Sequence, residues 1–365
     1  MVVKAKHKPN TALLVSIFLL VLIGVLALTT SSIPLSLKNS NNPNYYLFHQ
    51  IQFGLLPGLI LAFIAFKIPL KFYKKYSLFI FLTATILMFA VFIPGLSRTE
   101  GGATRWLNFG PFGFQPSEFL KLSTILYLGA ILSSNRPQNK KLWAFLFVLG
   151  IAALALVLQS NLSTLIIISL VSCIIFFCAN TPLLYNLGIW AMGIISSIAL
   201  AVLEPYRMKR LMVFLNPEAD PMGIGYQLKQ SLIAIGSGGL IGSGLGFSAQ
   251  KFGFLPEATS DAIFAIYAEE TGFIGCLFLI SAFIIFAVMC FMIFRKETDN
   301  FNKLIAIGIG SWIVIQALIN ISAMTGLLPL SGTPLPFITY GSSHLLFELI
   351  ACGILLNVSA QIKEN

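Results

Sequence analysis

A short stretch between two apolar regions concentrates carboxylates. Residues 255–270, LPEATSDAIFAIYAEE, hold Glu257, Asp261, Glu269 and Glu270, four of the 13 acidic residues in a chain that is 57% hydrophobic. Ionisable groups at membrane depth are costly unless paired or hydrated, so each one beside an apolar run is a candidate for function. Asp261 stands where a polar segment enters an apolar run. There it would either cap a helix or, partly desolvated, act as a general base or metal ligand, and its position alone does not decide between the two.

Other charged residues lie inside apolar runs. Glu118 and Lys121 are three apart and share a helical face, where they would either brace the bundle as an ion pair or line a polar cavity. Glu269 and Glu270 are adjacent, so they point about 100° apart and cannot share one partner. We expect one of them to brace the preceding loop. Glu348 would pair with Lys121 or accept from a backbone donor.

The elements that must position these residues are membrane helices. A helix needs about 20 residues to cross a bilayer, and this chain of 365 residues contains apolar runs of about that length. We therefore predict an all-α polytopic membrane protein of about ten transmembrane helices, with residues 1–365 forming one integral membrane domain. The expected helices cover residues 11–28, 51–67, 77–95, 118–134, 143–158, 162–179, 183–203, 262–294, 303–325 and 342–360.

Basic residues predict the orientation of these helices. Lys4, Lys6 and Lys8 precede the first run, and no A-x-A-like cleavage site follows it, which indicates a retained signal anchor. More than half of the 23 basic residues fall in the tails and alternate loops on one side, so the positive-inside rule places both termini in the cytoplasm. The formal net charge of +10 therefore follows from topology, indicates attraction to anionic membrane lipid, and does not require nucleic acid.

Three outer segments follow from this topology: residues 97–117, 204–261 and 326–341. The large extracytoplasmic loop, about 204–261, lies between helices seven and eight, and its stretch YQLKQSLIAIGSGGL predicts a helix at the membrane interface. Glycines between residues 236 and 246 permit tight turns or close backbone approach. The five cysteines lie in apolar runs without metal-ligand spacing and the three histidines are scattered, which argues against a zinc site.

Three long stretches resemble signature sequences of the SEDS family, the ten-helix FtsW, RodA and SpoVE glycosyltransferases of bacterial cell-wall synthesis. They are GGATRWLNFGPFGFQPSEFLK, the stretch from NPEADPMGIGYQLKQSLIAIGSGGL through SAQKFGFLPEATSDAIFAIYAEETGFIG, and INISAMTGLLPLSGTPLPFITYGSS. The resemblance spans about residues 95–360, and YQLKQSLIAIGSGGL and SAQK favour the FtsW and SpoVE branch, hence cell division. Departures occur as well: SNLST stands for a usual P-D-x-G-T, EATSD for E-A-H-T-D and YGSSH for Y-G-G-S-S, which indicates a divergent member.

The resemblance implies polymerisation of lipid II into glycan strands on the outer face of the bacterial cytoplasmic membrane. It places the essential aspartate on Asp261, as base or metal ligand, and the conserved pair of the fourth helix on Glu118 and Lys121. An inverting transfer of this kind needs one carboxylate to accept the proton of the attacking hydroxyl. A divalent cation, Mg²⁺ or Mn²⁺, with Arg105, Lys121 or Lys251 would stabilise the departing undecaprenyl diphosphate.

Further expectations concern the large loop, the partners and the rival functions. Glu257 is expected to position the loop, while Glu269 and Glu270 support helix eight. The partners implied are a class B penicillin-binding protein acting as transpeptidase and other divisome or elongasome proteins. A lipid II flippase would use similar features but would also place ionisable groups toward the cytoplasm. A non-catalytic scaffold for a transpeptidase is the third alternative.

Overall fold

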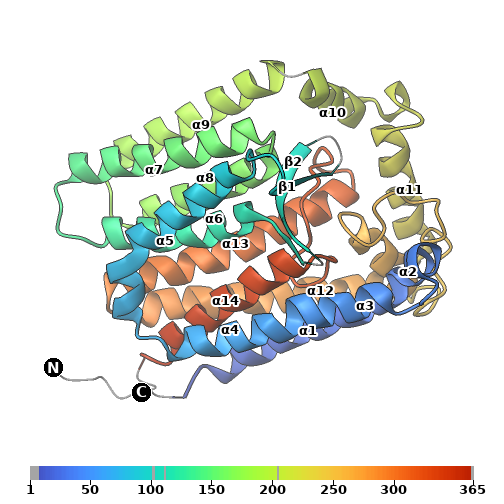
Figure 1. Cartoon of the computed structure of the whole chain (residues 1–365), viewed down its shortest axis with the longest axis horizontal. Coiled ribbons are helices and arrows are strands. Elements are labelled where there is room, and N and C mark those ends of the chain that lie inside the picture. Colours follow the sequence, from blue (N-terminus) through green and yellow to red (C-terminus); the bar gives the residue numbers. More distant parts are fainter. Residues whose placement is uncertain (1–7, 101–102, 111, 204, 363–365) are drawn as a thin grey trace.

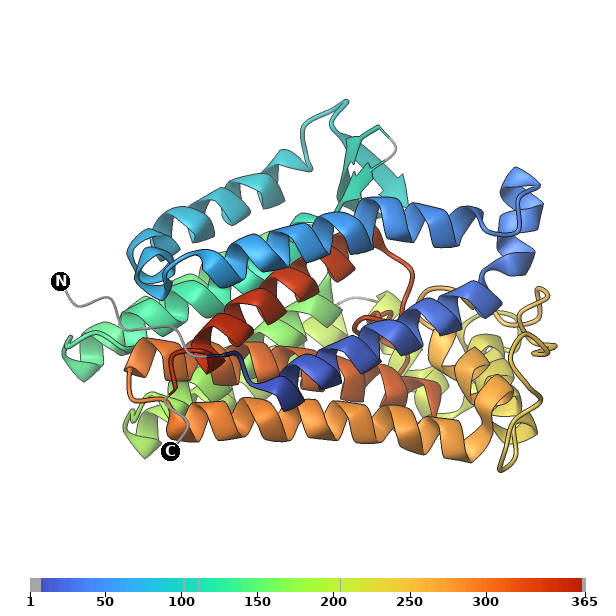
Figure 2. The same ribbon diagram turned by 90° about the horizontal axis from the view of Figure 1, so that it is seen from below.

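The helices run alongside one another as an elongated bundle (Figure 1). The computed structural model describes residues 8–100, 103–110, 112–203 and 205–362. Helix α1 begins and helix α14 ends at one end of the bundle, and the opposite end carries a small sheet and several short helices (Figures 1 and 2). The helices are α1 (Thr11–Ser31), α2 (Ile33–Ser40), α3 (Tyr45–Gln50), α4 (Leu56–Lys67), α5 (Leu70–Ala90), α6 (Pro116–Leu132), α7 (Gln138–Leu158), α8 (Leu162–Cys178), α9 (Leu183–Leu203), α10 (Pro205–Leu215), α11 (Ile224–Ser237), α12 (Ile263–Lys296), α13 (Asn300–Met324) and α14 (Ser342–Ser359), with a π-helical turn (Ile51–Leu55) before α4 and a 3₁₀ turn (Pro217–Ala219) before α11.

Every apolar run that the sequence singles out contains a helix. In the described part of the chain, seven helical segments are long and apolar enough to cross a membrane: α1, Tyr45–Lys67, α5, α7, α12, α13 and α14. Their outward faces carry large exposed apolar side chains such as Phe63, Phe79 and Phe278, as expected for surfaces in contact with lipid. The predicted start of α5 was wrong, because the helix begins at Leu70, after Pro69, and includes basic residues that interrupt the apolar run.

Helix α6 occupies the middle of the bundle. It packs against α5, α8 and α13, and most of its residues are buried, including Glu118 and Lys121 near its start. Helix α14 packs closely on α4 because glycines allow the backbones to approach: a side chain at Gly353 would meet the Ala62 carbonyl oxygen, and one at Gly58 would meet Leu349. Small residues at a helix crossing are typical of membrane bundles.

A three-stranded antiparallel sheet precedes α6. Strands β1 (Ser97–Glu100), β2 (Ala103–Phe109) and β3 (Phe112–Phe114) pair in the order β1-β2-β3. The backbone N–H of Gln115 donates to the Ser343 hydroxyl at 3.0 Å, so the sheet's last strand leads the chain onto the start of α14. The sheet therefore positions the first turn of α6 beside the N-terminus of α14.

The loop between α11 and α12 and the loop between α13 and α14 both lie at the sheet end. The predicted interfacial helix is α11, which ends where the glycine-rich segment begins. Part of the predicted outer segment 326–341 is buried: residues 330–341, here called the buried loop, contain Leu330, Thr333, Leu335, Phe337 and Thr339, all buried. The loop tolerates burial because polar side chains from neighbouring helices satisfy its backbone.

Candidate active site

Asp261 lies in the turn before α12 and is not its cap. The N-cap of α12 is Ala262, and no side chain caps this helix, so the capping interpretation does not hold. Within the described residues no hydrogen bond reaches the Asp261 carboxylate, whereas its backbone carbonyl accepts from the Asn320 side chain at 2.8 Å. The backbone is thus fixed while the carboxylate can accept a proton or a ligand.

The buried loop holds the segment that carries Asp261. Thr339 donates its hydroxyl to the Ser260 carbonyl at 3.1 Å, and the N–H of Tyr340 donates to the Thr259 carbonyl at 3.0 Å. Asn320 uses its second hydrogen on the Thr333 carbonyl at 2.7 Å, so one amide bridges the turn and the buried loop. Asp261 is therefore positioned by α13 and the buried loop together.

Charged groups surround the Asp261 carboxylate. Burial by its neighbours, followed by the like charge of Glu257, raises the pKa of Asp261 to about 6, although Arg210 and Arg105 act in the opposite direction. Gly332 lies between two of these groups: a side chain there would come within 3.2 Å of Asp261 Oδ2 and 4.0 Å of Arg210 Nη2. A glycine at this position therefore keeps the space between the carboxylate and the guanidinium open.

The two guanidinium groups are fixed by backbone carbonyls. Arg210 of α10 donates Nη1 to the Leu330 carbonyl at 2.8 Å. Arg105 of β2 donates Nε to the Gln159 carbonyl at 3.1 Å and Nη2 to the Ser160 carbonyl at 2.6 Å, at the break between α7 and α8. Two arginines that are distant in the sequence, on β2 and α10, thus bring positive charge to Asp261.

Glu257 shapes the turn before Asp261. It has a left-handed backbone (φ 55°), its carbonyl accepts from the N–H groups of Ser260 and Ala262, and its carboxylate accepts from the Ser260 hydroxyl. The structure thus places this residue where it supports the Asp261 turn, and its charge is near enough to act on Asp261.

Glu118 and Lys121 form a buried ion pair. Lys121 Nζ lies 2.8 Å from Glu118 Oε2, and the two side chains are only 3% and 2% exposed. The ammonium also donates to Gln316 Oε1 at 2.8 Å and lies 4.9 Å from the centre of the Trp312 ring. Gln316 in turn donates to the Pro334 carbonyl at 3.0 Å, which connects the pair to the buried loop.

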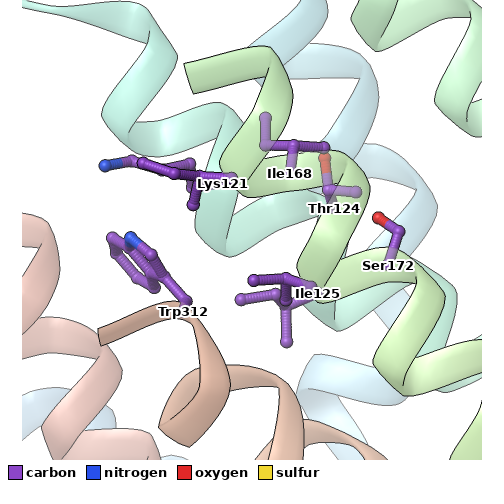
Figure 3. A pocket seen from close by; sticks show the side chains of 8 residues that line it. Lys121, Thr124, Ile125, Ile168, Ser172 and Trp312 are labelled. Carbon is purple, nitrogen blue, oxygen red and sulfur yellow. The ribbon is translucent and has the colours of Figure 1, made fainter. Parts of the chain in front are cut away.

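Lys121 also borders a small cavity. The cavity offers about 10 Å³ to the centre of a water molecule, which is room for about one water. Figure 3 shows Lys121 and Trp312 on one side of it and the hydroxyls of Thr124 and Ser172 on the other. The ion-pair interpretation therefore describes these residues, while the cavity beside Lys121 is lined mainly by apolar side chains.

Glu348 of α14 uses a backbone donor. Its Oε2 accepts from the N–H of Phe337 at 2.8 Å, and the residue is fully buried. Phe337 has a left-handed backbone (φ 65°), a conformation that costs a non-glycine residue about 1–2 kcal/mol. The hydrogen bond from Glu348 favours this conformation and so helps to fix the bend in the buried loop.

Buried polar contacts bind the loop that follows α11 to α12. They involve Lys251 of the loop and Glu269 and Glu270 of α12. Lys251 Nζ lies 2.8 Å from Glu270 Oε1, with both side chains buried. Glu269 accepts from the Ala249 N–H at 2.9 Å and from the Ser248 hydroxyl. Both glutamates therefore brace the loop, whereas the sequence led us to expect only one of them to do so. Neither Lys251 nor Lys121 is among the charged groups that shift the pKa of Asp261.

In the described residues, His, Cys, Asp and Glu side chains form no group of three or more that could hold a metal ion. Asp261 and Glu257 are the two carboxylates close enough to influence each other at the site. Mg²⁺ is commonly held by one or two carboxylates together with substrate phosphates, so this donor set fits a cation that arrives with a diphosphate.

Three contributors to the site were missed by sequence reasoning: Arg210, Gln316 and Asn320. The last two interrupt an apolar run at positions four apart, and Trp312 lies four residues earlier, so all three share one face of α13. That spacing was a usable signal. Arg210 lies among other basic residues of the large loop, and nothing in that pattern distinguishes it.

Comparisons with known proteins agree with this arrangement. The family model described as "Cell cycle protein" and named for FtsW, RodA and SpoVE matches residues 10–364. A probable peptidoglycan glycosyltransferase FtsW of Trichlorobacter lovleyi is 35% identical over 358 residues, which covers 97% of this chain and 94% of the relative. The protein of the same description from Coxiella burnetii is 37% identical over 354 residues, or 94% of each chain.

Solved structures share the fold. A structure described as "Structural coordination of polymerization and crosslinking by a peptidoglycan synthase complex" superposes with a TM-score of 0.79 at 21% identity, covering 98% of this chain and 99% of the other. The rod shape determining protein RodA of Thermus thermophilus superposes with a TM-score of 0.73 at 21% identity, covering 98% of each chain. The arrangement of helices around Asp261 is therefore one that solved proteins adopt.

Proposed function

Since the chain belongs to the FtsW, RodA and SpoVE family of cell cycle proteins, we propose that it is a peptidoglycan glycosyltransferase that polymerises lipid II. The observation that carries the proposal is the Asp261 carboxylate, which caps no helix, has a pKa raised to about 6 and is flanked by two arginines. A base with a pKa close to the working pH is efficient, because it is both deprotonated and basic enough to accept a proton.

The proposed reaction is one inverting displacement. The 4-hydroxyl oxygen of the acceptor sugar attacks the anomeric carbon of the donor, and the bond from that carbon to the phosphate oxygen breaks. Asp261 takes the hydroxyl proton, and the electron pair of the broken bond leaves with undecaprenyl diphosphate. Arg105 and Arg210 supply positive charge where negative charge develops on the diphosphate, which lowers the barrier because both are already fixed by backbone carbonyls.

A divalent cation fits this site when substrate is present. In the alternative in which Asp261 is a metal ligand and not the base, Asp261 and Glu257 would hold the cation, and the substrate's diphosphate would supply further oxygen ligands. When bound, such an ion neutralises charge on the leaving group. We propose Mg²⁺ or Mn²⁺ for this role, since both prefer oxygen ligands.

Among the described residues, the buried ion pairs Glu118–Lys121 and Lys251–Glu270 are connected to the loops near Asp261, not to Asp261 itself. The charged groups of Glu118 and Lys121 pair inside the bundle, and Gln316 connects Lys121 to the Pro334 carbonyl of the buried loop. Lys251 is similarly committed to Glu270 and to the Gly246 carbonyl. We therefore assign these residues a positioning role.

The chain is a multi-pass protein of the inner membrane. We propose that both termini are cytoplasmic and that Asp261 faces outward. Basic residues flank the turns between α4 and α5 and between α12 and α13, and both turns lie at the end of the bundle where α1 begins and α14 ends, opposite the sheet (Figure 1). This distribution agrees with the positive-inside rule.

We further propose a class B penicillin-binding protein as partner and cell division as the process served. The match to a peptidoglycan synthase complex supports a transpeptidase partner. The FtsW descriptions of the relatives support the division branch.

The test is reconstitution in liposomes with purified lipid II, Mg²⁺ and the transpeptidase partner. Polymerase activity predicts glycan strands, and these must form when lipid II is already exposed on the side facing Asp261. If the chain produced no glycan but moved labelled lipid II between leaflets, the flippase would be the better assignment. If it did neither and only increased cross-linking by the partner, the scaffold would be favoured.

A further inference from the structure

The segment between α11 and α12 exposes a row of large apolar side chains. Residues 240–254, here called the apolar loop, present Ile241 at 78% and Phe247 at 76% exposure. Soluble loops rarely expose side chains of this size together, so a contiguous set of them marks a contact with lipid or protein. The exposed members are Leu240, Ile241, Leu245, Phe247, Phe252 and Phe254.

The apolar loop is held firmly in this exposed conformation. The N–H of Phe273 donates to the Gly239 carbonyl at 2.9 Å, and that of Ile274 donates to the Leu240 carbonyl at 3.1 Å. Glu269 binds the backbone of Ala249 from the other side. These hydrogen bonds therefore fix the backbone of the loop in the conformation that exposes its apolar side chains.

The apolar loop also presents no charge. Lys251 is the one charged residue between positions 238 and 256, and its ammonium is buried against Glu270 and the Gly246 carbonyl. A protein docking surface usually combines aromatic anchors with arginine and a polar rim. An uncharged set of leucine, isoleucine and phenylalanine instead resembles a surface that enters lipid.

The position of the loop relative to the bilayer follows from α12. This helix changes direction at Gly272, whose backbone is left-handed (φ 65°). Residues 273–294 contain no charged residue and, at about 1.5 Å per residue, extend about 33 Å, close to the roughly 30 Å thickness of the hydrocarbon core. Gly272 therefore lies near the hydrocarbon boundary on the Asp261 side, at the level where the Leu240 carbonyl binds the N–H of Ile274.

The apolar loop continues the lipid-facing surface of α12. Phe273, Ile274, Leu277 and Phe278 are all exposed along the outer part of this helix. Figure 2 shows the segment between α11 and α12 at the end of the bundle where α12 begins. The apolar loop begins directly beside this lipid-facing part of α12, since the carbonyls of Gly239 and Leu240 accept from the N–H groups of Phe273 and Ile274.

We propose that the apolar loop inserts into the interface of the membrane leaflet on the Asp261 side and binds lipid directly. Insertion holds the turn that carries Asp261 at the level of the lipid head groups. This assignment concerns the membrane itself and stands independently of the transferase reaction.

The experiment places a nitroxide spin label at Phe247→Cys in a variant whose five native cysteines are replaced by alanine or serine. The full chain is reconstituted in phosphatidylethanolamine–phosphatidylglycerol vesicles, and collision rates with oxygen and with a water-soluble nickel chelate are measured. Phe278→Cys on α12 is the lipid-exposed control, and Glu218→Cys is the control for a water-exposed position in the same large loop. Ile241→Cys provides a second position in the apolar loop if Phe247→Cys does not fold.

Insertion predicts that the label at position 247 or 241 shows a several-fold higher oxygen-to-nickel ratio than the label at position 218 and approaches that at position 278. A ratio equal to that at position 218 would overturn the proposal. Shielding from both reagents in the chain alone would indicate contact between copies. A label that is accessible to water until a transpeptidase partner is added, and is then shielded, would assign the surface to a protein. Either result would also overturn lipid insertion.

Discussion

Asn320 offers a sharp test of how the site is positioned. Its side-chain amide donates to the Asp261 carbonyl at 2.8 Å and to the Thr333 carbonyl at 2.7 Å. Asn320→Leu has similar volume and removes both donors. A buried acceptor left unpaired costs about 1–3 kcal/mol, so two of them predict a loss of about 2–6 kcal/mol in the free energy of unfolding.

The catalytic effect should exceed what instability explains. Because Asp261 loses one of its backbone restraints, and a shift of about 1 Å in a reacting group costs on the order of 100-fold in rate, we expect kcat per folded molecule to fall by at least about tenfold. KM should change less, since no substrate-contacting group is removed.

Asn357→Leu is the matched control. Asn357 is also buried and donates to two carbonyls, Ile68 at 2.6 Å and Ala65 at 3.4 Å, near the end of α14 away from the site. Both variants are assayed by denaturant unfolding in lipid micelles and by lipid II turnover normalised to folded protein. Equal turnover per folded molecule in both variants would refute a positioning role for Asn320.

Three further predictions follow from other contacts. Lys121→Met should lower the free energy of unfolding by about 3–5 kcal/mol, because it leaves Glu118 buried without its partner, and adding Glu118→Gln should recover part of that loss; additive losses in the unfolding assay would contradict a coupled pair. Since only the deprotonated Asp261 accepts a proton, kcat/KM should decline as pH falls through about 6. Glu257→Gln should move that decline to lower pH, because it removes a like charge that raises the pKa of Asp261. A pH–rate profile unchanged by the substitution would oppose the assignment of Asp261 as the base. Gly272→Ala should destabilise the protein by more than the strain of about 1–3 kcal/mol that its backbone conformation imposes on a non-glycine residue, because the new methyl group would lie 2.3 Å from the Gly242 nitrogen. An unfolding curve equal to that of the wild type would exclude this close approach.

The sequence predicted the helices well because their signal is local. An apolar run of bilayer length identifies a helix without knowledge of its neighbours. The start of α5 was misplaced because Lys71, Lys74 and Lys75 lie within the helix but outside its apolar run. The three-stranded sheet was missed, since its strands are only three to seven residues long and their pairing depends on register.

The site was only partly accessible from sequence. Asp261 was identified from its position and from the resemblance, but Arg105, Arg210 and Gly332 reach it from three distant parts of the chain, and only folding brings them together. The partner of Glu348 could not be chosen in advance, because it is the backbone N–H of Phe337, which only folding brings beside α14.

The most direct test of the central claim compares wild type with Asp261→Asn in lipid II polymerisation, after both proteins show the same unfolding curve. The asparagine keeps the shape of the side chain and removes its ability to accept a proton as a base. We predict glycan strands from the wild type and none from the variant. Equal product from both proteins would contradict the assignment of Asp261 as the catalytic base.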